Sequence, residues 1–341
     1  MKCNLSKIKV SYIFILFLTI SCSYNEKVEN YPSSHFMSSF LNHSKWDNGK
    51  AEISAYELKV ESSVLFENEI TQKTEIDTLV LSVTKHLFDT EVLHKVSEKN
   101  GSKVKDAFLM VQLLRKDVLN AGTSHTTTLQ FDRTNLQPYK LSIAKNSYEG
   151  NTYVEQQFYQ KESVIEQYYL GDGVSGNKTI LDYDKPYYSI EQIPFLVRVL
   201  KLEMKESWSF QFVTYKMDVP LLAKAFVGDN IFELHFSKIA EEQIELNGNV
   251  ITADVIQVDY KDDIFPPIKT IGGLIPKQEK YWISKDSERM ILMVEGKGAL
   301  FKKDSIKAES GYKLSLIDSI NMDWWNKGES LSLRLYLKAF R

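Results

Sequence analysis

Few side chains in this 341-residue chain have the types and spacing that chemistry requires. Acid–base catalysis uses paired carboxylates, and two short polar segments could supply them, at Asp182 and Asp184 and at Asp262 and Asp263. Surface loops carry such clusters routinely, no nucleophile–base pair can be read from the sequence, and the six histidines lack metal-ligand spacing. Nucleophile-elbow, zinc-protease and Walker motifs are also absent from the sequence, and the glycine-rich residues 171–176 fit a hairpin loop better than a phosphate-binding loop. We therefore expect no enzyme, no metal site and no cofactor, and a carboxylate-dependent hydrolase is the least favoured interpretation.

Cys22 is the side chain for which the sequence indicates a modification. It follows an apolar run over residues 13–21, and Lys2, Lys7 and Lys9 precede that run without an acidic residue among them. A basic start and a short apolar core are typical of a secretory signal peptide, and the run is shorter than the ~20 residues that cross a bilayer. We predict a signal peptide over residues 1–21. An ordinary cleaved signal that has a cysteine nearby is the alternative to a lipid-acceptor cysteine.

The segment that ends at Cys22 resembles a bacterial lipoprotein signal, although Thr19 stands where leucine is usual. The resemblance implies that Cys22 becomes the lipidated first residue and that the membrane is a partner through this N-terminal lipid. Each buried methylene contributes about 0.8 kcal/mol, so several acyl chains anchor a protein firmly. Ser23 follows the cysteine and favours the outer membrane, with the protein facing the periplasm. The expected location is therefore the cell envelope.

Composition excludes several other classes of partner and fold. The chain has 42 basic and 45 acidic residues, a net charge of −3, which gives no basic face for nucleic acid. Its two cysteines, Cys3 and Cys22, belong to the signal and to the lipid site, so we expect a mature fold without disulfides. Residues 22–45 are predicted to be the lipidated cysteine and a polar tether, in which Phe36 and Phe40 could dock as part of a short helix. Residues 46–341 are predicted to form a single β-rich domain.

Alternation of apolar and polar residues dominates that domain. Residues 56–61 and 232–237 show the period of two that is typical of half-buried strands, and Asn247-Gly248 is a strong hairpin signal. Helices are few: we favour a helix over Val104–Leu119, where a strand fits nearly as well, and expect a second over Ser189–Lys201. The pattern predicts a mainly β fold, an antiparallel meander with one face buried.

A more specific pattern occupies the second half of the chain. The helix candidate that contains Arg198 is followed by Trp208-Ser209-Phe210, then by the Asn247-Gly248 hairpin, and then by Trp282-Ile-Ser-Lys-Asp286-Ser-Glu-Arg289. Over roughly residues 46–294 this order resembles bacterial envelope proteins of the domain-of-unknown-function family three-one-zero-eight. That family is similar in fold to the lipoprotein carriers LolA and LolB.

The resemblance implies a strongly curved antiparallel sheet, a LolA-like half-barrel, with one or two helices against its concave face. It further implies that the concavity holds acyl chains. Candidate lining residues lie on the expected helix and strands, and they are Phe195, Leu196, Val199, Trp208, Phe210 and Trp282.

The motif Trp282, Asp286 and Arg289 has two open interpretations. Asp286 could accept backbone N–H groups in a tight turn and Arg289 could pair with a carboxylate, which is a structural role. Alternatively, Arg289 could bind an anionic head group, because a guanidinium suits phosphate and carboxylate.

The expected function is that of a lipid-anchored envelope protein that binds a hydrophobic or acylated ligand, either a lipid or an acylated envelope component, in its cavity. The alternative is a structural or assembly lipoprotein whose cavity is filled by its own side chains and which acts through a protein partner of unknown identity.

Overall fold

The structure of the chain is a computed structural model that describes residues 33–66, 69–115, 124–147, 150–159, 162, 164–171, 174–182, 187–213, 231–260, 278–303 and 306–322. The chain separates into two units, Met1–Ser33 and Ser34–Arg341, and every described strand belongs to the second unit. Cys22, the predicted signal and Asp184, Asp262 and Asp263 lie outside the described residues. In the described part, no helix is long and apolar enough to cross a membrane.

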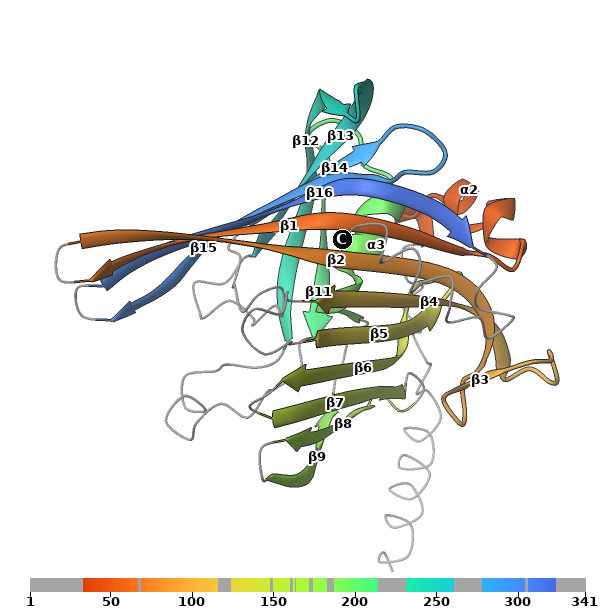
Figure 1. Cartoon of the computed structure of the whole chain (residues 1–341). Coiled ribbons are helices and arrows are strands. Elements are labelled where there is room, and N and C mark those ends of the chain that lie inside the picture. Colours follow the sequence, from red (N-terminus) through yellow and green to blue (C-terminus); the bar gives the residue numbers. More distant parts are fainter. Residues whose placement is uncertain are drawn as a thin grey trace, which may run out of the picture. The chain divides into compact units, whose positions relative to one another are not determined.

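One large curved sheet makes up most of the second unit (Figure 1). Its 16 strands are β1 Ala51–Phe66, β2 Glu69–Asp89, β3 His94–Val96, β4 Val104–Arg115, β5 Ser124–Asp132, β6 Pro138–Ser147, β7 Gly150–Tyr159, β8 Val164–Gly171, β9 Val174–Asp182, β10 Tyr187–Ser189, β11 Ser207–Val213, β12 Ile231–Leu246, β13 Asn249–Tyr260, β14 Gln278–Ser284, β15 Ile291–Lys303 and β16 Ile306–Met322. The helical elements are η1 Ser33–His35, α2 Ser38–Leu41, η2 Ser44–Asp47, η4 Ile190–Gln192 and α3 Ile193–Val199.

The strand order places β1 and β16 side by side in the middle of the sheet. Strands β2 and β4 to β9 extend the sheet on one side of this pair, and β15 back to β10 extend it on the other. Pairing is antiparallel throughout, apart from the parallel β10–β11 pair. Within the described residues, β9 is the last strand at one edge of the sheet and β10 is the last at the other. The curved sheet is therefore not closed. The mainly β, curved and antiparallel fold predicted from the sequence is therefore confirmed.

Helix α3 lies against the concave face of the sheet, and it forms where the sequence predicted the second helix. Ser189 caps the preceding turn by accepting a hydrogen bond from the Glu191 N–H at 3.4 Å, and Pro194 stands in the first turn, where its missing N–H costs nothing. Apart from Pro194, every residue of α3 is buried. A helix this short is marginal alone, so packing against the sheet must stabilise it.

The predicted helix over Val104–Leu119 is wrong: Val104–Arg115 is strand β4. Both faces of β4 are buried, with Phe108 and Met110 on the concave side and Ala107 and Leu109 on the other. A strand buried on both faces reads as a continuous apolar run, which periodicity cannot separate from a helix. The Asn247-Gly248 hairpin is confirmed, since both residues have positive φ, 52° and 77°, between Leu246 and its partner Asn249.

Residues 33–47, which we call the N-terminal strap, pack onto the body of the fold. Met37 N donates to Val199 O at 2.8 Å and Lys201 N donates to His35 O at 2.9 Å, which joins the strap to the end of α3. Phe36 and Phe40 are buried, as are Leu41 and Trp46. The folded body thus includes residues 33–45, which the sequence assigned to the tether while allowing that part of it could dock.

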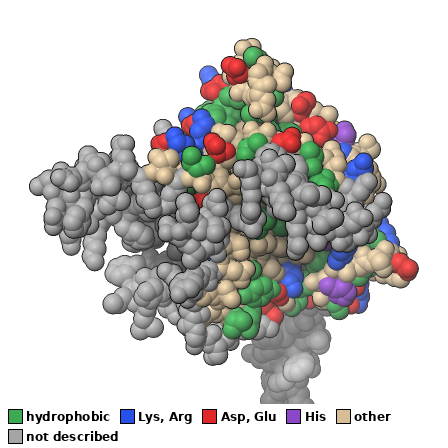
Figure 2. Space-filling model, viewed as in Figure 1, with side chains coloured by type: hydrophobic (Ala, Val, Ile, Leu, Met, Phe, Trp, Pro, Cys, Tyr) green, Lys and Arg blue, Asp and Glu red, His purple; other side chains and the backbone are tan. Residues whose placement is uncertain are grey.

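The visible surface carries charges of both signs, mixed with apolar side chains (Figure 2). The exposed ion pairs are spread over several strands, such as Lys59–Glu61 on β1 and Lys313–Glu295 between β16 and β15. Figure 1 also shows the paired far ends of β1, β2, β15 and β16 extending as a ribbon beyond the rest of the sheet.

Candidate functional site

A buried ion pair joins α3 to β1. Arg198, in the last turn of α3, is 1% exposed, and its guanidinium contacts both oxygens of Glu52 at 2.6 and 3.0 Å. Two further guanidinium N–H groups donate to the backbone oxygens of Arg289 and Glu288, at 2.8 and 2.9 Å. Burial alone would raise the pKa of Glu52, but Arg198 and Lys45 outweigh it and hold the pKa of this carboxyl below its usual value.

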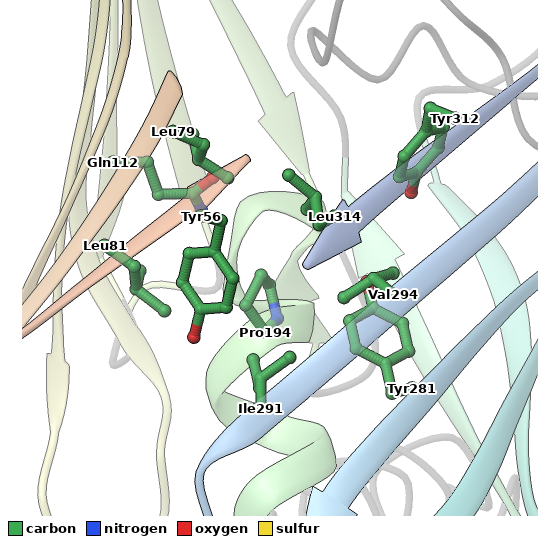
Figure 3. A pocket seen from close by; sticks show the side chains of 10 residues that line it. All are labelled: Tyr56, Leu79, Leu81, Gln112, Pro194, Tyr281, Ile291, Val294, Tyr312 and Leu314. Atoms are coloured by element: carbon green, nitrogen blue, oxygen red, sulfur yellow. The ribbon is translucent and has the colours of Figure 1, made fainter. Parts of the chain in front are cut away.

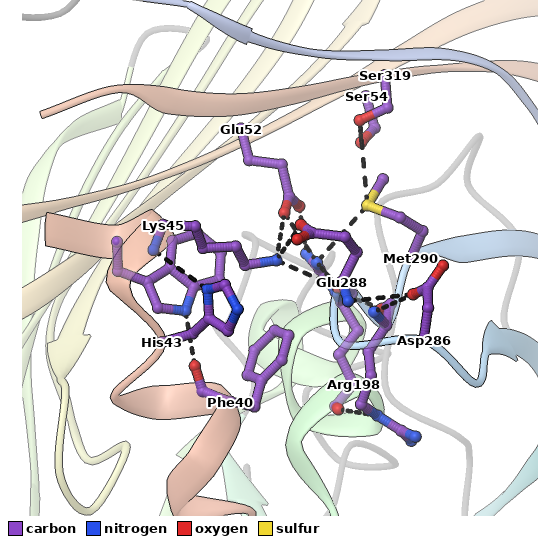
Figure 4. Close-up of polar contacts among 12 residues, drawn as sticks. Phe40, His43, Lys45, Glu52, Ser54, Arg198, Asp286, Glu288, Met290 and Ser319 are labelled. Atoms are coloured by element: carbon purple, nitrogen blue, oxygen red, sulfur yellow. Dashed lines mark hydrogen bonds and ion pairs between the residues drawn. The ribbon is translucent and has the colours of Figure 1, made fainter. Parts of the chain in front are cut away.

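Lys45 of the N-terminal strap completes this buried charge cluster, which we define as the buried side chains of Lys45, Glu52 and Arg198 together with that of Glu288, which is 41% exposed (Figure 4). Its Nζ lies 3.1 Å from Glu52 Oε2 and 2.7 Å from Glu288 Oε2. The same ammonium lies over the ring of Trp46, at 4.6 Å from the centroid. The cluster therefore ties together the strap, β1, α3 and the turn before β15.

Asp286 and Arg289, two residues of the predicted motif, lie in that turn. Asp286 Oδ1 accepts hydrogen bonds from Ser284 Oγ and from the backbone N–H groups of Glu288 and Arg289, at 2.8, 3.1 and 3.0 Å. Arg289 adopts a positive φ of 46°, donates from Nε to Arg198 O at 2.5 Å, and lies 3.4 Å from Asp254 Oδ2. Asp286 and Arg289 thus both bind groups of the protein itself, which is the arrangement that the structural interpretation of the motif expects.

Trp282, the third residue of that motif, lies apart from the other two. It stands on β14, where it alternates with the concave-facing Tyr281, and its Nε1 donates to Glu242 Oε2 at 2.8 Å. The side chain is buried. Because neighbouring strand residues point to opposite faces, Trp282 belongs to the outer face of the sheet.

Three of the candidate lining residues, Phe195, Leu196 and Val199, are on α3 and are fully buried. The ring of Phe195 packs against Phe108 and Phe131, with centroids 4.9 and 5.0 Å apart. The remaining two, Trp208 and Phe210, are on β11. Phe210 stacks on Phe36 of the strap at 6.1 Å, and Trp208 lies over the ring of His35 at 3.4 Å. Phe195 and Phe210 thus belong to an aromatic core at this end of the concavity, with Leu196 and Val199 buried beside them and Trp208 at its partly exposed edge.

A cavity lies farther along the concave face, between α3 and strands of both halves of the sheet (Figure 3). About 360 Å³ of space lies in and in front of the cavity, a volume that includes open solvent, and the part of it that a water molecule can enter is small. That is room for about one water molecule. The walls are mostly apolar. They comprise Tyr56, Leu79, Leu81, Gln112, Pro194, Tyr281, Ile291, Val294, Tyr312 and Leu314, and none of the six residues predicted to line a cavity.

Two tyrosines of the cavity wall share one buried carboxylate. Glu279 is 0% exposed, and it accepts hydrogen bonds from the Tyr281 hydroxyl at 3.2 Å and from the Tyr312 hydroxyl. Tyr312 reaches it by crossing β15 at Gly296, where a Cβ would collide with the tyrosine ring. In the sheet register Gly296 lies between Glu279 on β14 and Tyr312 on β16. Only glycine leaves room for the Tyr312 ring to pass over β15 at this position.

The sequence held a signal for part of this cavity. Tyr56 belongs to an alternating segment that the sequence predicts to be a strand, but single-sequence alternation does not say which strands face each other. Glu279 and Tyr281 share a strand face because they are two positions apart. The pairing of β14 with β15 and of β15 with β16, which brings Tyr312 to Glu279, is not encoded in any local pattern.

The structure also places a serine beside a histidine. Ser209 Oγ is 2.6 Å from His235 Nδ1, and His235 Nε2 is 3.7 Å from Glu233 Oε1. Ser209 on β11 lies opposite His235 on β12, and Glu233 stands two positions before His235 on the same strand. The three side chains therefore share one partly exposed face of the sheet. They do not line the cavity beneath α3. A hydrolase would in addition need an enclosed site with oxyanion donors. Among the described residues, no group of three or more potential ligands could hold a metal ion.

Comparison with known proteins does not assign the chain to a family. No protein-family model matches the chain, and no curated protein matches it significantly. Among solved structures, it is similar to the crystal structure of a beta-barrel-like protein of domain of unknown function DUF1849 from Brucella abortus. The two share 7% sequence identity with a TM-score of 0.41, over 80% of this chain and 98% of that chain.

Proposed function

We propose that this protein is a lipid-anchored envelope protein whose curved sheet binds an apolar chain, from a lipid or an acylated envelope component, in the cavity beneath α3. The cavity wall carries the proposal. Side chains from β1, β2, β15, β16 and α3 present an almost entirely apolar surface to one partly open space. Concave apolar sites with a few polar groups are where hydrophobic ligands bind, at about 25 cal/mol per Å² of apolar surface removed from water. The signal-like segment that ends at Cys22 supports the envelope location.

A second candidate function follows from the small free space. Because the cavity has room for about one water molecule, a ligand chain must displace wall side chains to enter. If the walls stay closed, the concavity is an ordinary core, and the protein acts as a structural or assembly lipoprotein through a protein partner. The two candidates differ in one observable, the presence of a bound apolar molecule.

Native mass spectrometry of the mature chain, residues 22–341 with Cys22→Ser and purified without detergent, separates them. The proposal predicts a mass adduct that organic solvent removes and that is a lipid, or a one-to-one complex with an added dodecyl probe. A clean mass that gains nothing from added probes would reject ligand binding and favour the filled core.

A cavity-filling variant tests the location. Leu81→Phe adds volume to the wall, and we expect it to weaken dodecyl-probe binding by about tenfold, since the added ring occupies the ligand space. The matched control is Val250→Phe, because Val250 is 66% exposed at the tip of β13. Equal probe affinities for the two variants would place the ligand elsewhere.

A further inference from the structure

A polar pocket lies on the convex face of the sheet, where β7 and β8 run side by side. The described residues that line it are Glu155, Gln157, Glu166, Gln167 and Tyr168. Glu155 aligns across β6 and β5 with Val111 on β4, the neighbour of Gln112, which lines the cavity beneath α3. Because neighbouring strand residues point to opposite faces, the polar pocket and that cavity are separate sites.

The polar pocket is open to small molecules. About 470 Å³ of space lies in and in front of it, a volume that includes open solvent, and water can enter much of that space. Polar atoms make up a large part of its wall. A small polar ligand can therefore enter without displacing side chains, in contrast to a ligand of the cavity beneath α3.

Hydrogen bonds within the protein hold one row of side chains on β7 in place. The Tyr159 hydroxyl donates to Gln157 Oε1 at 2.7 Å, and Gln157 Nε2 donates to Glu155 Oε1 at 2.5 Å. Glu155 Oε2 accepts from the Tyr153 hydroxyl and lies 3.0 Å from Lys140 Nζ. These groups are therefore oriented before a ligand arrives, which reduces the ordering cost of binding.

Gln157 and Glu155 keep a donor and an acceptor side by side. A glutamine amide has two N–H groups, and among the described residues only one N–H of Gln157 has a partner, Glu155 Oε1, which accepts no other hydrogen bond there. Burial alone would raise the pKa of Glu155, but Tyr153, Gln157 and Lys140 outweigh it and keep this pKa below its ordinary value. Glu155 is thus an ionised acceptor at neutral pH. An adjacent donor and acceptor match a hydroxyl group, which can both accept and donate.

Tyr168 gives the polar pocket an exposed aromatic surface. It lies opposite Glu155 in the sheet register and is 42% exposed. Within the part of the chain that the structure describes, its hydroxyl makes no hydrogen bond to the protein. A tyrosine offers a rigid apolar ring with a polar tip. The apolar face of a sugar ring can pack on this ring while its hydroxyl groups reach Gln157 and Glu155.

The charges of the pocket disfavour an ionic ligand. Glu155 is paired with Lys140, and Glu166 has an interaction of its own within the protein, so neither carboxylate depends on a ligand cation. An anionic ligand would meet both carboxylates and, among the described lining residues, no cation. An apolar chain would cover Gln157 and Glu155 without replacing their hydrogen bonds to water, which is costly.

From this arrangement we propose that the polar pocket binds a neutral saccharide, with the sugar ring on Tyr168 and a hydroxyl group between Gln157 and Glu155. The inference goes beyond the proposed function and does not depend on it, because the two sites lie on opposite faces of the sheet. Amino-sugar polymers of a cell wall and plain glucans share this chemistry, and the probes below distinguish them.

Two trisaccharides and a cationic probe test the ligand class: maltotriose, the trimer of β-1,4-linked N-acetylglucosamine, and spermidine. Each is titrated into the mature chain, residues 22–341 with Cys22→Ser, and dissociation constants are measured by saturation-transfer NMR. We expect at least one trisaccharide to bind with a dissociation constant of about 1 mM or tighter, and spermidine to bind more weakly. Tighter binding of the N-acetylglucosamine trimer would identify an amino-sugar polymer as the ligand, and tighter binding of maltotriose a plain glucan.

Two substitutions test the location. Tyr168→Ala should weaken binding of the preferred trisaccharide by about tenfold or more, the size of effect that truncation of an aromatic contact residue produces. Leu170→Ala is the matched control, because Leu170 is 46% exposed on the same face of β8 and does not line the pocket, so it should leave the affinity unchanged. Gln157→Leu keeps the size of the side chain and removes the donor, and it should weaken binding by about fivefold.

Several results would overturn the saccharide inference. Failure of both trisaccharides to bind would do so, as would tighter binding of spermidine than of either trisaccharide. Equal trisaccharide affinities for Tyr168→Ala and Leu170→Ala would place the sugar elsewhere and overturn the assignment of this pocket. Each of these results leaves dodecyl-probe binding in the cavity beneath α3 untouched, so the saccharide inference and the proposed function fail or stand separately.

Discussion

Arg198 and Glu52 stand 146 positions apart in the sequence and meet as a buried, two-point ion pair. We expect Arg198→Met to lower the free energy of unfolding by about 3–5 kcal/mol, because it leaves the Glu52 carboxylate buried with one partner fewer and removes one hydrogen bond each from the backbone oxygens of Arg289 and Glu288. Arg198→Lys should recover little of this, since an ammonium cannot reproduce the planar fork.

Urea unfolding of the variants measures these differences. Lys313→Met is the control, because its exposed pair with Glu295 is expected to contribute at most about 1 kcal/mol. A loss below about 1 kcal/mol for Arg198→Met would contradict the view that the buried charge cluster depends on this residue.

His86 predicts how stability depends on pH. It lies on β2 at 7% exposure, and burial, with a smaller effect of Lys95, lowers its pKa to about 4. Burial and Lys145 lower the pKa of His125 to about 4 as well. Between pH 6.5 and 4 the unfolded chain binds protons that the folded chain refuses, so stability falls as pH falls, by up to about 1.4 kcal/mol per pH unit for each histidine.

Unfolding measured at pH 7, 6 and 5 checks this slope. His86→Leu should remove about half of it, because one of the two buried histidines no longer titrates. Asp47, whose pKa the Arg133 side chain lowers to about 2, titrates below this window and does not mask the effect. An unchanged slope in His86→Leu would show that His86 is protonated in the folded state.

At the scale of elements, the N-terminal strap contributes a substantial share of the core. The Phe40 ring packs edge-on against Trp46 and Phe195, and the Arg198 guanidinium lies over it at 5.2 Å. Phe40→Ala should therefore lower the free energy of unfolding by about 3–5 kcal/mol. Val92→Ala, at a position that is 59% exposed, should stay within about 0.5 kcal/mol of the unmodified chain. Equal values in urea unfolding would mean that the strap is only loosely docked.

The elements differ in how well local sequence predicts them. Alternation and the Asn247-Gly248 turn predicted strands and a hairpin because both signals are local. Sequence alone could not decide between a helix and a strand at Val104–Arg115. This segment is buried on both faces, and the structure that packs against those faces determines which of the two forms. Of the aromatic residues predicted to line a cavity, Phe195 and Phe210 lie in a filled core and Trp208 is only partly buried. Their neighbours in that core come from the strap and β4, whose positions no local pattern gives.

At the scale of the whole molecule, the proposed anchor is testable through its cysteines. Cys22→Ser should abolish labelling by a palmitate analogue and release the chain from the membrane fraction, because the thiol is the proposed acceptor of the lipid. Cys3→Ser is the matched control, since Cys3 would leave with the signal peptide. Labelling that survives in Cys22→Ser would contradict the lipoprotein assignment.

The central pairing of β1 with β16 has a consequence for how the chain reaches its native state. Ser54 on β1 hydrogen-bonds Ser319 on β16, across 265 positions of sequence. Contacts between distant segments must overcome a large loop-closure entropy, so they form late and slowly. The middle of the sheet cannot be completed until nearly the whole chain is available. An exported chain of this design would therefore remain unfinished throughout its translocation, with open strand edges that need protection from aggregation until β16 arrives.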